Sequence, residues 1–397
     1  MKVLLIDVNC KYSSTGKIVY DLYTALNSNG HTAAICYGRG PLVEGKNIYK
    51  FSSNIEVNLH ALLTRITGLT GYFSHFATYN LLKFINRFKP DVVHIHELHA
   101  YFVNIAPVMN YLKKNNIKTI WTFHCEFMYT GKCGYAFECD NWRSKCGNCP
   151  QVKGYPSSFF FDFTKKMFRD KRKLFEGFNN LLIATPSQWL ADRVKRSFLG
   201  NRNISVIHNG IDTQNVFFPR ASEHLKFKYR ITEEKIILAV APGIMEERKG
   251  GKYIIELAKR FRNQKFKFIL IGVDDLNEKF DDNIVVLGRT KNQTELAEYY
   301  SLADVFVICS SRENFPTTCI EALSCGTPIA GFDAGGTKET APGDLGAFVS
   351  YGDIDGLRNA ILKTNKSKEL SEKCETFGKM MYSINKMYES YQSLYEQ

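Results

Sequence analysis

Short apolar runs rich in Val and Ile alternate along the chain with longer stretches in which apolar residues recur at helical spacing. The first run, Val3–Ile6, precedes a helical pattern over Lys17–Asn29 that ends at Gly30. Such alternation is typical of parallel βαβ units, whose strands are buried on both faces and therefore apolar throughout. Further strands of this first part are predicted at Thr32–Cys36, Asp91–Ile95, Lys118–Thr122, Leu181–Ala184 and Ile204–Ile207.

The alternation breaks over Asn209–Glu234, a polar stretch without a clear period that we interpret as a linker. It then restarts, with helices expected at Gly250–Phe261 and Thr294–Ser301 between further strands. Those strands are predicted at Ile236–Ala241, Phe266–Ile271, Ile284–Leu287, Val305–Cys309 and Pro328–Ala330. The sequence therefore predicts an α/β protein of two doubly wound, Rossmann-like domains that face each other across a cleft.

The predicted boundaries place the first domain at residues 1–208 and the second at residues 209–377. A last helix over residues 378–397 has an apolar stripe at spacings of three and four, and we expect it to pack back toward the first domain. Ligands of such domains bind outside the carboxyl ends of the strands. A cleft between two domains suits an enzyme that holds two substrates and closes over them.

Composition and charge narrow the classes of function. The 397 residues suit two or three domains, and no stretch approaches the roughly 18 unbroken apolar residues of a membrane-spanning helix. The start of the chain lacks the features of a signal peptide, so we expect a cytoplasmic protein. The net charge is +12, and residues 1–215 hold 27 Lys and Arg against 14 Asp and Glu. This excess fits nucleic acid, an anionic membrane surface or a phosphorylated substrate.

The densest basic segment is Lys165–Phe175, which follows the aromatic run Phe159–Phe163. Basic residues interleaved with large apolar ones suit a membrane interface, where cations meet anionic lipid. A solvated helix with one buried aromatic face has the same pattern, and the sequence favours neither interpretation over the other.

Charged residues of the second domain lie where its strands end. Glu313 follows a predicted strand and precedes a helix whose first turn is Pro316–Cys319, and free N–H groups of such a turn can hold a phosphate. Glu321 comes eight residues later, inside that helix, and its carboxylate can accept hydrogen bonds from a ribose diol. Arg248 and Lys249 lie in a strand-to-helix turn and can clamp a diphosphate.

These motifs resemble those of family 4 glycosyltransferases. The resemblance rests on Glu313 and Glu321 with seven residues between them, the turn Arg248–Gly250, and the segments Pro186–Leu190 and Ile207–Asp212. It runs over nearly the whole chain. It implies the GT-B fold, a nucleotide-sugar donor such as a UDP- or GDP-sugar, transfer with retention of anomeric configuration, and chemistry that needs no metal.

The resemblance also implies roles for single residues. Arg248 and Lys249 would bind the donor diphosphate, and Glu321 would hold the ribose. Glu313 and the backbone near Phe315 would contact the donor sugar and stabilise positive charge at the transferring carbon. Gly16 matches the glycine loop after the first strand, which approaches the donor phosphate in such enzymes.

The first domain has a second group of candidate residues. His124 ends a predicted strand, and the resemblance places it near the donor sugar and the acceptor as a catalytic residue. Many relatives carry aspartate after this histidine, whereas this chain has Cys125. His96, Glu97 and His99 follow another strand, and we interpret them as an acceptor-side surface rather than a metal site.

Four of the eleven cysteines lie close together in the sequence, within an expected insertion over residues 125–150. They are Cys133, Cys139, Cys146 and Cys149. Four thiolates at this spacing fit a closed tetrahedral zinc site, and the alternatives are reduced thiols or disulfides. A subset of related transferases carries a similar insertion. A structural zinc would pin the long loop without joining the chemistry.

The resulting hypothesis is a retaining glycosyltransferase that works peripherally at the inner face of the cytoplasmic membrane. The acceptor would be a glycan or a polyprenyl-linked oligosaccharide of a surface polysaccharide. A nucleotide-sugar epimerase or hydrolase on the same fold is the first alternative. A nucleic-acid-binding protein is the second, but the chain lacks a recognisable nucleic-acid-binding motif, so we expect no nucleic acid partner.

Overall fold

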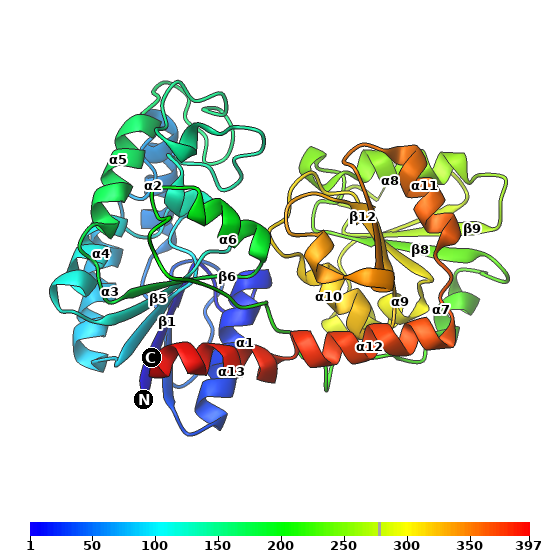
Figure 1. The fold of residues 1–397 in the computed structure, drawn as a ribbon, viewed down its shortest axis with the longest axis horizontal. Helices are drawn as coiled ribbons and strands as arrows, with labels where there is room; N and C mark the ends of the chain where they lie inside the picture. Colours follow the sequence, from blue (N-terminus) through cyan, green and yellow to red (C-terminus); the bar gives the residue numbers. More distant parts are fainter. Residues whose placement is uncertain (277–278) are drawn as a thin grey trace. The chain divides into compact units, whose positions relative to one another are not determined.

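A computed structural model describes residues 1–276 and 279–397. The chain divides into two compact units, Met1–Ile207 together with Met387–Gln397, and His208–Lys386 (Figure 1). The first boundary falls one residue before the predicted one. Within the described residues, none of the helices combines the length and the apolar character that membrane crossing requires.

The first unit contains a parallel seven-stranded sheet in the order β3-β2-β1-β4-β5-β6-β7. Because β1 pairs with β2 on one side and β4 on the other, the chain reverses its winding direction at β1. The strands are β1 (Lys2–Asp7), β2 (Thr32–Tyr37), β3 (Ile48–Lys50), β4 (Val92–Ile95), β5 (Lys118–Thr122), β6 (Leu181–Thr185) and β7 (Ile204–Val206). The helices are α1 (Ser14–Ser28), α2 (Asn54–Thr67), α3 (His75–Phe88), α4 (Ile105–Lys114), α5 (Thr164–Phe175) and α6 (Gln188–Lys195), with short 3₁₀ turns η1 (Phe127–Tyr129) and η2 (Asn141–Arg143).

The second unit has a parallel six-stranded sheet in the order β10-β9-β8-β11-β12-β13. Its strands are β8 (Lys235–Val240), β9 (Phe266–Ile271), β10 (Ile284–Leu287), β11 (Val305–Ile308), β12 (Ile329–Phe332) and β13 (Gly346–Val349). Its helices are α7 (Glu223–Lys228), α8 (Gly251–Arg260), α9 (Gln293–Leu302), α10 (Thr317–Ser324), α11 (Ile354–Lys363) and α12 (Lys368–Tyr382), with 3₁₀ turns η3 (Glu247–Lys249), η4 (Lys338–Thr340) and η5 (Gly343–Leu345).

The prediction of two doubly wound Rossmann-like domains is confirmed, and every predicted strand forms within two residues of its expected ends. Two strands were not predicted. Both β3 and β13 lie at a sheet edge and are only half-buried, so their sequences lack the continuous apolar run that identifies a central strand.

The interpretation of Asn209–Glu234 as a linker is wrong. This segment belongs to the second unit, forms α7, and contributes Ile211, Phe217, Leu225 and Ile231 to its hydrophobic core. Its apolar residues are too widely spaced to show a period, yet these four side chains lie in the core, whereas Phe227 is exposed.

The prediction of a single last helix over residues 378–397 is also wrong. The chain leaves the helical conformation at Ser383, between α12 and α13 (Ile384–Glu396). Ser383 pairs with Ile211 as an isolated β-bridge. The Ile211 N–H donates to the Tyr382 carbonyl (2.8 Å), and the Ile384 N–H donates back to the Ile211 carbonyl (3.1 Å). These bonds replace the helical ones that would join α12 to α13.

Residues from Met387 onward belong to the first unit. There the Tyr395 hydroxyl lies 2.7 Å from Nδ1 of buried His94, and the Tyr391 hydroxyl lies 2.9 Å from the hydroxyl of Thr122. The tyrosine stripe seen in the sequence is thus an internal surface that carries hydrogen-bonding groups into the core.

A buried histidine joins α2 to the loop before α3. His60 Nε2 accepts a hydrogen bond from the Gly71 N–H (3.3 Å), so Nδ1 carries the proton and donates to the Ser74 hydroxyl (2.7 Å). A second proton would break the bond to Gly71. Burial lowers the pKa of His60 to about 3, with a smaller contribution from nearby His75.

We expect His60 to make the first unit less stable in acid. The unfolded-state pKa lies near 6.5 and the folded-state pKa near 3, so protons bind the unfolded state preferentially as pH falls below about 6.5. Between pH 7 and pH 5 the wild type should lose about 2 kcal/mol more stability than His60→Gln. Urea unfolding followed by tryptophan fluorescence measures this, because Trp121, Trp142 and Trp189 all lie in the first unit.

The control for this experiment is His224→Gln, which removes an exposed histidine of the second unit. It should keep the pH dependence of the wild type. An equal loss of stability between pH 7 and pH 5 in the wild type and in His60→Gln would contradict the attribution of this pH dependence to His60.

Candidate functional site

A buried carboxylate and two cations meet in the second unit at the carboxyl end of its sheet. Strands β8 and β11 are neighbours, so the loops that follow them approach each other. Glu313, in the loop after β11, accepts hydrogen bonds at Oε1 from Lys249 Nζ (2.8 Å) and from Arg248 Nη1 (3.1 Å). The structure therefore brings Arg248 and Lys249, which the sequence predicts to bind the donor diphosphate, together with Glu313, which it predicts as a catalytic residue at the donor sugar.

Two glycines allow the backbone to make this cluster. Gly250 follows Lys249 with φ of +75°, and a Cβ atom there would lie 2.1 Å from the Cys309 carbonyl oxygen. Gly335 has φ of +78°, and its Cβ would lie 2.0 Å from the Glu313 carbonyl oxygen. Gly336 donates its N–H to the same oxygen (2.9 Å). The loop after β12 thus positions Glu313. In the sequence, the pair Gly335 and Gly336 after a predicted strand was the feature that could have indicated this role.

The electrostatics favour an ionised Glu313. Burial by itself raises the pKa of this carboxyl, but Lys249 and Arg248 outweigh that effect and bring the pKa below its usual value. Two cations face one carboxylate, so the three side chains together carry a net positive charge. Such an arrangement suits a bound anion, and a diphosphate has the size and charge to use both cations.

Glu321 lies on α10 and is held by a residue that sequence reasoning missed. The Tyr300 hydroxyl, from α9, donates to Glu321 Oε2 (2.8 Å), and both side chains are buried. Burial and the adjacent carboxylate raise the pKa of Tyr300 well above its ordinary value, so the tyrosine stays a hydrogen-bond donor. No motif in the sequence marks Tyr300, because its partner lies on a different helix.

The ring of Phe315 is a packing group. It is 5% exposed, stacks on His208 at 4.7 Å between ring centroids, and meets the edge of Tyr382 at 5.6 Å. The Phe315 carbonyl accepts a hydrogen bond from the Asn209 amide (3.5 Å). These contacts fix the backbone just before α10, which is the part of Phe315 expected to face the donor.

Gly16 lies in the first turn of α1, and the structure gives it a packing role. Its N–H donates to the hydroxyl of the N-cap residue Ser13 (3.3 Å), and a Cβ atom would lie 3.1 Å from the Asn9 side chain. The glycine therefore lets the loop after β1 fold closely onto the helix. Its predicted contact with a donor phosphate stays a prediction.

Three imidazoles lie together: that of His94 within β4, that of His96 just after β4, and that of His124 after β5. His96 Nδ1 is 2.9 Å from His124 Nε2, and the two rings stack at 5.2 Å. His94 lies beside His96, with 4.1 Å between their ring centroids. Burial lowers the pKa of His124 to about 4, and burial with the neighbouring histidines lowers that of His96 well below its usual value. The pair is therefore neutral near pH 7, so that one ring donates to the other.

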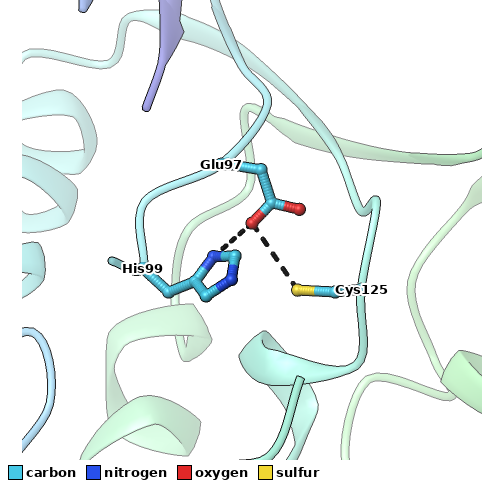
Figure 2. Close-up of side chains that lie close together, drawn as sticks. All are labelled: Glu97, His99 and Cys125. Atoms are coloured by element: carbon cyan, nitrogen blue, oxygen red, sulfur yellow. Dashed lines mark hydrogen bonds and ion pairs between the residues drawn. The ribbon is translucent and has the colours of Figure 1, made fainter. Parts of the chain in front are cut away.

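Glu97, His99 and Cys125 form a hydrogen-bonded group beside these histidines (Figure 2). One oxygen of Glu97 is paired with His99 Nδ1 and accepts from the Cys125 thiol (3.5 Å). Burial alone would raise the pKa of Glu97, but His99 and the thiol bring it below its ordinary value. Within residues 1–276 and 279–397, this is the one group of three possible metal ligands whose donor atoms all lie within 4.8 Å.

The thiol of Cys125 is a donor rather than a nucleophile. Burial and the adjacent Glu97 carboxylate raise its pKa well above the ordinary value, so it stays protonated. The carboxylate of this cluster comes from Glu97.

Sequence reasoning also missed Asp7, the last residue of β1. Its side chain is fully buried, and Oδ2 accepts a hydrogen bond from the Asn9 N–H (3.1 Å). Among the described residues, no hydrogen-bond partner exists for Oδ1. Burial, with the nearby Glu97 charge, raises its pKa well above normal and favours the neutral acid. The feature of the sequence that could have identified Asp7 is an acidic residue at the end of an apolar strand.

The four clustered cysteines are free thiols that line one small cavity in the segment between β5 and α5. The structure thus brings these four residues together, whereas the zinc predicted for them remains a proposal.

Two family models match this chain and together cover most of it. The model of glycosyltransferase family 4 matches residues 15–215, and the model of glycosyl transferases group 1 matches residues 221–381. The first covers more than half of the chain. The chain therefore belongs to glycosyltransferase family 4, as the resemblance of its motifs implied.

Individual proteins agree with this assignment. The chain is 24% identical over 434 residues to the putative colanic acid biosynthesis glycosyl transferase WcaC of Escherichia coli K12, with all of both chains covered. Sucrose-phosphate synthase from Thermosynechococcus elongatus superposes with a TM-score of 0.73 at 16% identity, covering 100% of this chain and 98% of that one. HepE from Anabaena, solved with UDP-glucose, gives a TM-score of 0.66 at 13% identity over all of both chains. These structures confirm the GT-B fold.

The cluster around Glu313 should stabilise the second unit through charge pairing. A double-mutant cycle of Lys249→Met and Glu313→Gln should give a coupling of about 1–3 kcal/mol, because both charges are largely removed from water. Hydrogen exchange of the β11 and α10 amides, read by mass spectrometry, reports the stability of this region. The exposed pair Lys265 and Glu233 is the control and should couple by less than about 0.5 kcal/mol. Equal coupling in both pairs would contradict the expectation.

Proposed function

We propose that this enzyme is a retaining glycosyltransferase that transfers a sugar from a UDP- or GDP-sugar to a glycan or lipid-linked acceptor in surface polysaccharide biosynthesis. The observation that carries the proposal is the buried Glu313 carboxylate paired with Lys249 and Arg248 at the end of the parallel sheet. The name of WcaC refers to colanic acid, a polysaccharide, and HepE was solved with UDP-glucose. Both names support the choice of pathway and donor class.

In this proposal the donor nucleotide uses groups of the second unit. Lys249 and Arg248 bind the diphosphate and stabilise the negative charge that it gains on leaving. Tyr300 orients the Glu321 carboxylate, which has lone pairs enough to accept hydrogen bonds from a ribose diol as well. Glu313 holds the two cations in place, so little reorganisation is needed when the charge develops.

The proposed reaction exchanges one bond at the anomeric carbon. The bond from that carbon to the diphosphate oxygen breaks, and a bond to the acceptor oxygen forms on the same face. The acceptor hydroxyl passes its proton to the departing phosphate. Glu313 and the backbone near Phe315 stabilise positive charge on the sugar, and neutral His124 supplies a hydrogen bond to the reacting groups. The chemistry requires no metal, because the side chains of Lys249 and Arg248 neutralise the diphosphate.

Lys249→Ala should lower kcat/KM for the donor by at least about a hundredfold, because the positive charge that stabilises the leaving diphosphate is lost. A thermal-shift panel of UDP-, GDP- and ADP-sugars identifies the donor first, and initial rates then measure the variant. The matched control is Lys252→Ala, an exposed lysine three residues along the chain, which should keep wild-type rates. Normal activity in Lys249→Ala would overturn the assignment of the diphosphate site.

The same assay separates transfer from an epimerase or hydrolase. A transferase consumes the donor at a rate that depends on the acceptor. Rapid donor turnover without any acceptor would favour the alternative instead.

We further propose that the first unit docks on an anionic membrane, where a lipid-linked acceptor is anchored. It holds 27 Lys and Arg against 15 Asp and Glu, whereas the second unit holds 25 of each. One face of α2 exposes an apolar stripe, and the aromatic run before α5 is exposed too. The residues are Ile55, Leu59, Leu62 and Ile66 on α2, and Phe159, Phe160, Phe161 and Phe163 in the run.

The two apolar surfaces lie next to each other in the fold. The Phe159 N–H donates to the Arg65 carbonyl (2.8 Å), so the aromatic run packs beside the end of α2. Helix α5 buries Met167, Phe168 and Phe175 and leaves Lys165, Arg169, Arg172 and Lys173 exposed. The buried aromatic face expected of a solvated helix is therefore present, and the exposed aromatics precede that helix. Apolar groups next to exposed cations suit a surface of anionic lipid.

Vesicle co-sedimentation tests this docking. The protein should bind vesicles of phosphatidylcholine with phosphatidylglycerol more tightly than vesicles of phosphatidylcholine alone. The variant Phe160→Ser with Phe161→Ser should reduce binding by about tenfold, because two exposed rings are lost. The control is Phe227→Ser, which removes a ring of similar exposure in the second unit. Equal binding by both variants would contradict the proposal.

A further inference from the structure

The segment between β5 and α5, residues 123–163, is ordered without strands or long helices. Its regular elements are the 3₁₀ turns η1 and η2. Its interior nevertheless contains fully buried side chains, among them Trp142, Tyr129 and Lys132. In Figure 1 this segment forms the loops beside the upper end of α5 in the first unit. Helices and strands therefore do not account for the packing of this segment.

Four cysteines of this segment surround one small cavity. The cavity has a volume of about 10 Å³, room for a single water-sized sphere. Cys133, Cys139, Cys146 and Cys149 all line it. The sulfurs surround the space without meeting, since among the described residues no three of them lie within 4.8 Å of one another.

The backbone already directs individual sulfurs toward this space. Asn148, with φ of +47°, gives the tight turn of Cys146-Gly147-Asn148-Cys149, so that both cysteines of the turn line the cavity. The Gly131 N–H donates to Cys146 Sγ (3.1 Å). Backbone N–H donors to sulfur stabilise the thiolate form, which is the form that binds a metal.

Two buried lysines give an independent observation. The ammonium groups of Lys132 and Lys171 each donate to three backbone carbonyls, Val152, Gly154 and Pro156 for the first and Phe127, Thr130 and Gly131 for the second. Within the described residues neither lysine forms an ion pair with a carboxylate. Lys132 itself lines the cavity of the four cysteines, and so does Gly131, whose carbonyl accepts the hydrogen bond from Lys171.

We propose that Cys133, Cys139, Cys146 and Cys149 bind one structural zinc ion as thiolates, with Lys132 and Lys171 as buried counter-ions. Zinc with four thiolates carries two negative charges, which the two ammonium groups balance. Four sulfur ligands close the tetrahedral site and leave no position for substrate, so the ion holds the loop together and takes no part in the transfer. The proposal is independent of the donor and acceptor proposed above.

Metal analysis of protein purified with reductant, without chelator and without a histidine tag tests the site. We expect about one zinc per chain in the wild type. Cys139→Ser and Cys149→Ser should each lower the zinc content at least about fivefold. Two controls should keep it: Cys374→Ala removes a buried cysteine of the second unit, and Glu97→Gln disrupts the neighbouring group of Glu97, His99 and Cys125.

Cobalt substitution identifies the ligands in the wild-type protein, even if the cysteine variants fail to fold. A tetrahedral four-thiolate site gives intense visible bands and a sulfur-to-cobalt charge-transfer band. Protein without metal, or an intact mass showing a disulfide among these cysteines, would overturn the proposal. Loss of zinc in Glu97→Gln with retention in both serine variants would overturn it too, by moving the ion to Glu97, His99 and Cys125.

Discussion

Burial of both faces of a parallel sheet is the constraint on which the chemistry of this protein depends. The strands of each unit are mostly apolar, so most polar side chains lie at the strand ends or in the loops that follow them, with exceptions such as His94 within β4. In the first unit, Asp7 ends β1 and His124 follows β5. In the second, the loops after β8 and β11 supply Lys249 and Glu313. Each unit therefore gathers its candidate functional residues at the carboxyl edge of its sheet.

Because these groups are removed from water, the groups next to them decide their pKa values. Two cations compensate the burial of Glu313 and bring its pKa below the usual value, and the contacts with His99 and the Cys125 thiol lower the pKa of Glu97. Burial instead raises the pKa of Asp7. The neighbours of each buried carboxyl group therefore decide whether it favours the ionised or the neutral form.

The two units divide the charge of the protein as well as its chemistry. The first unit carries the whole net charge of +12, and the second is neutral. The compact cation cluster of the second unit is therefore a local feature, suited to one small anion. The exposed cations of the first unit are spread over helix surfaces, which suits an extended anionic surface.

The sequence by itself determined the order of strands and helices along the chain and the two-domain architecture, and it marked Lys249, Arg248, Glu313 and Glu321 as candidate site residues. Apolar runs and short motifs carry this information because strands and their following loops are local. Tertiary structure alone decided that Tyr300 orients Glu321, that Gly335 supports Glu313, and that Ser383 breaks the last helix. Each of these depends on a contact between segments distant in sequence, which no local pattern records. The burial of Lys132 and Lys171 likewise depends on tertiary structure, because nothing in the local sequence distinguishes these two lysines from exposed ones.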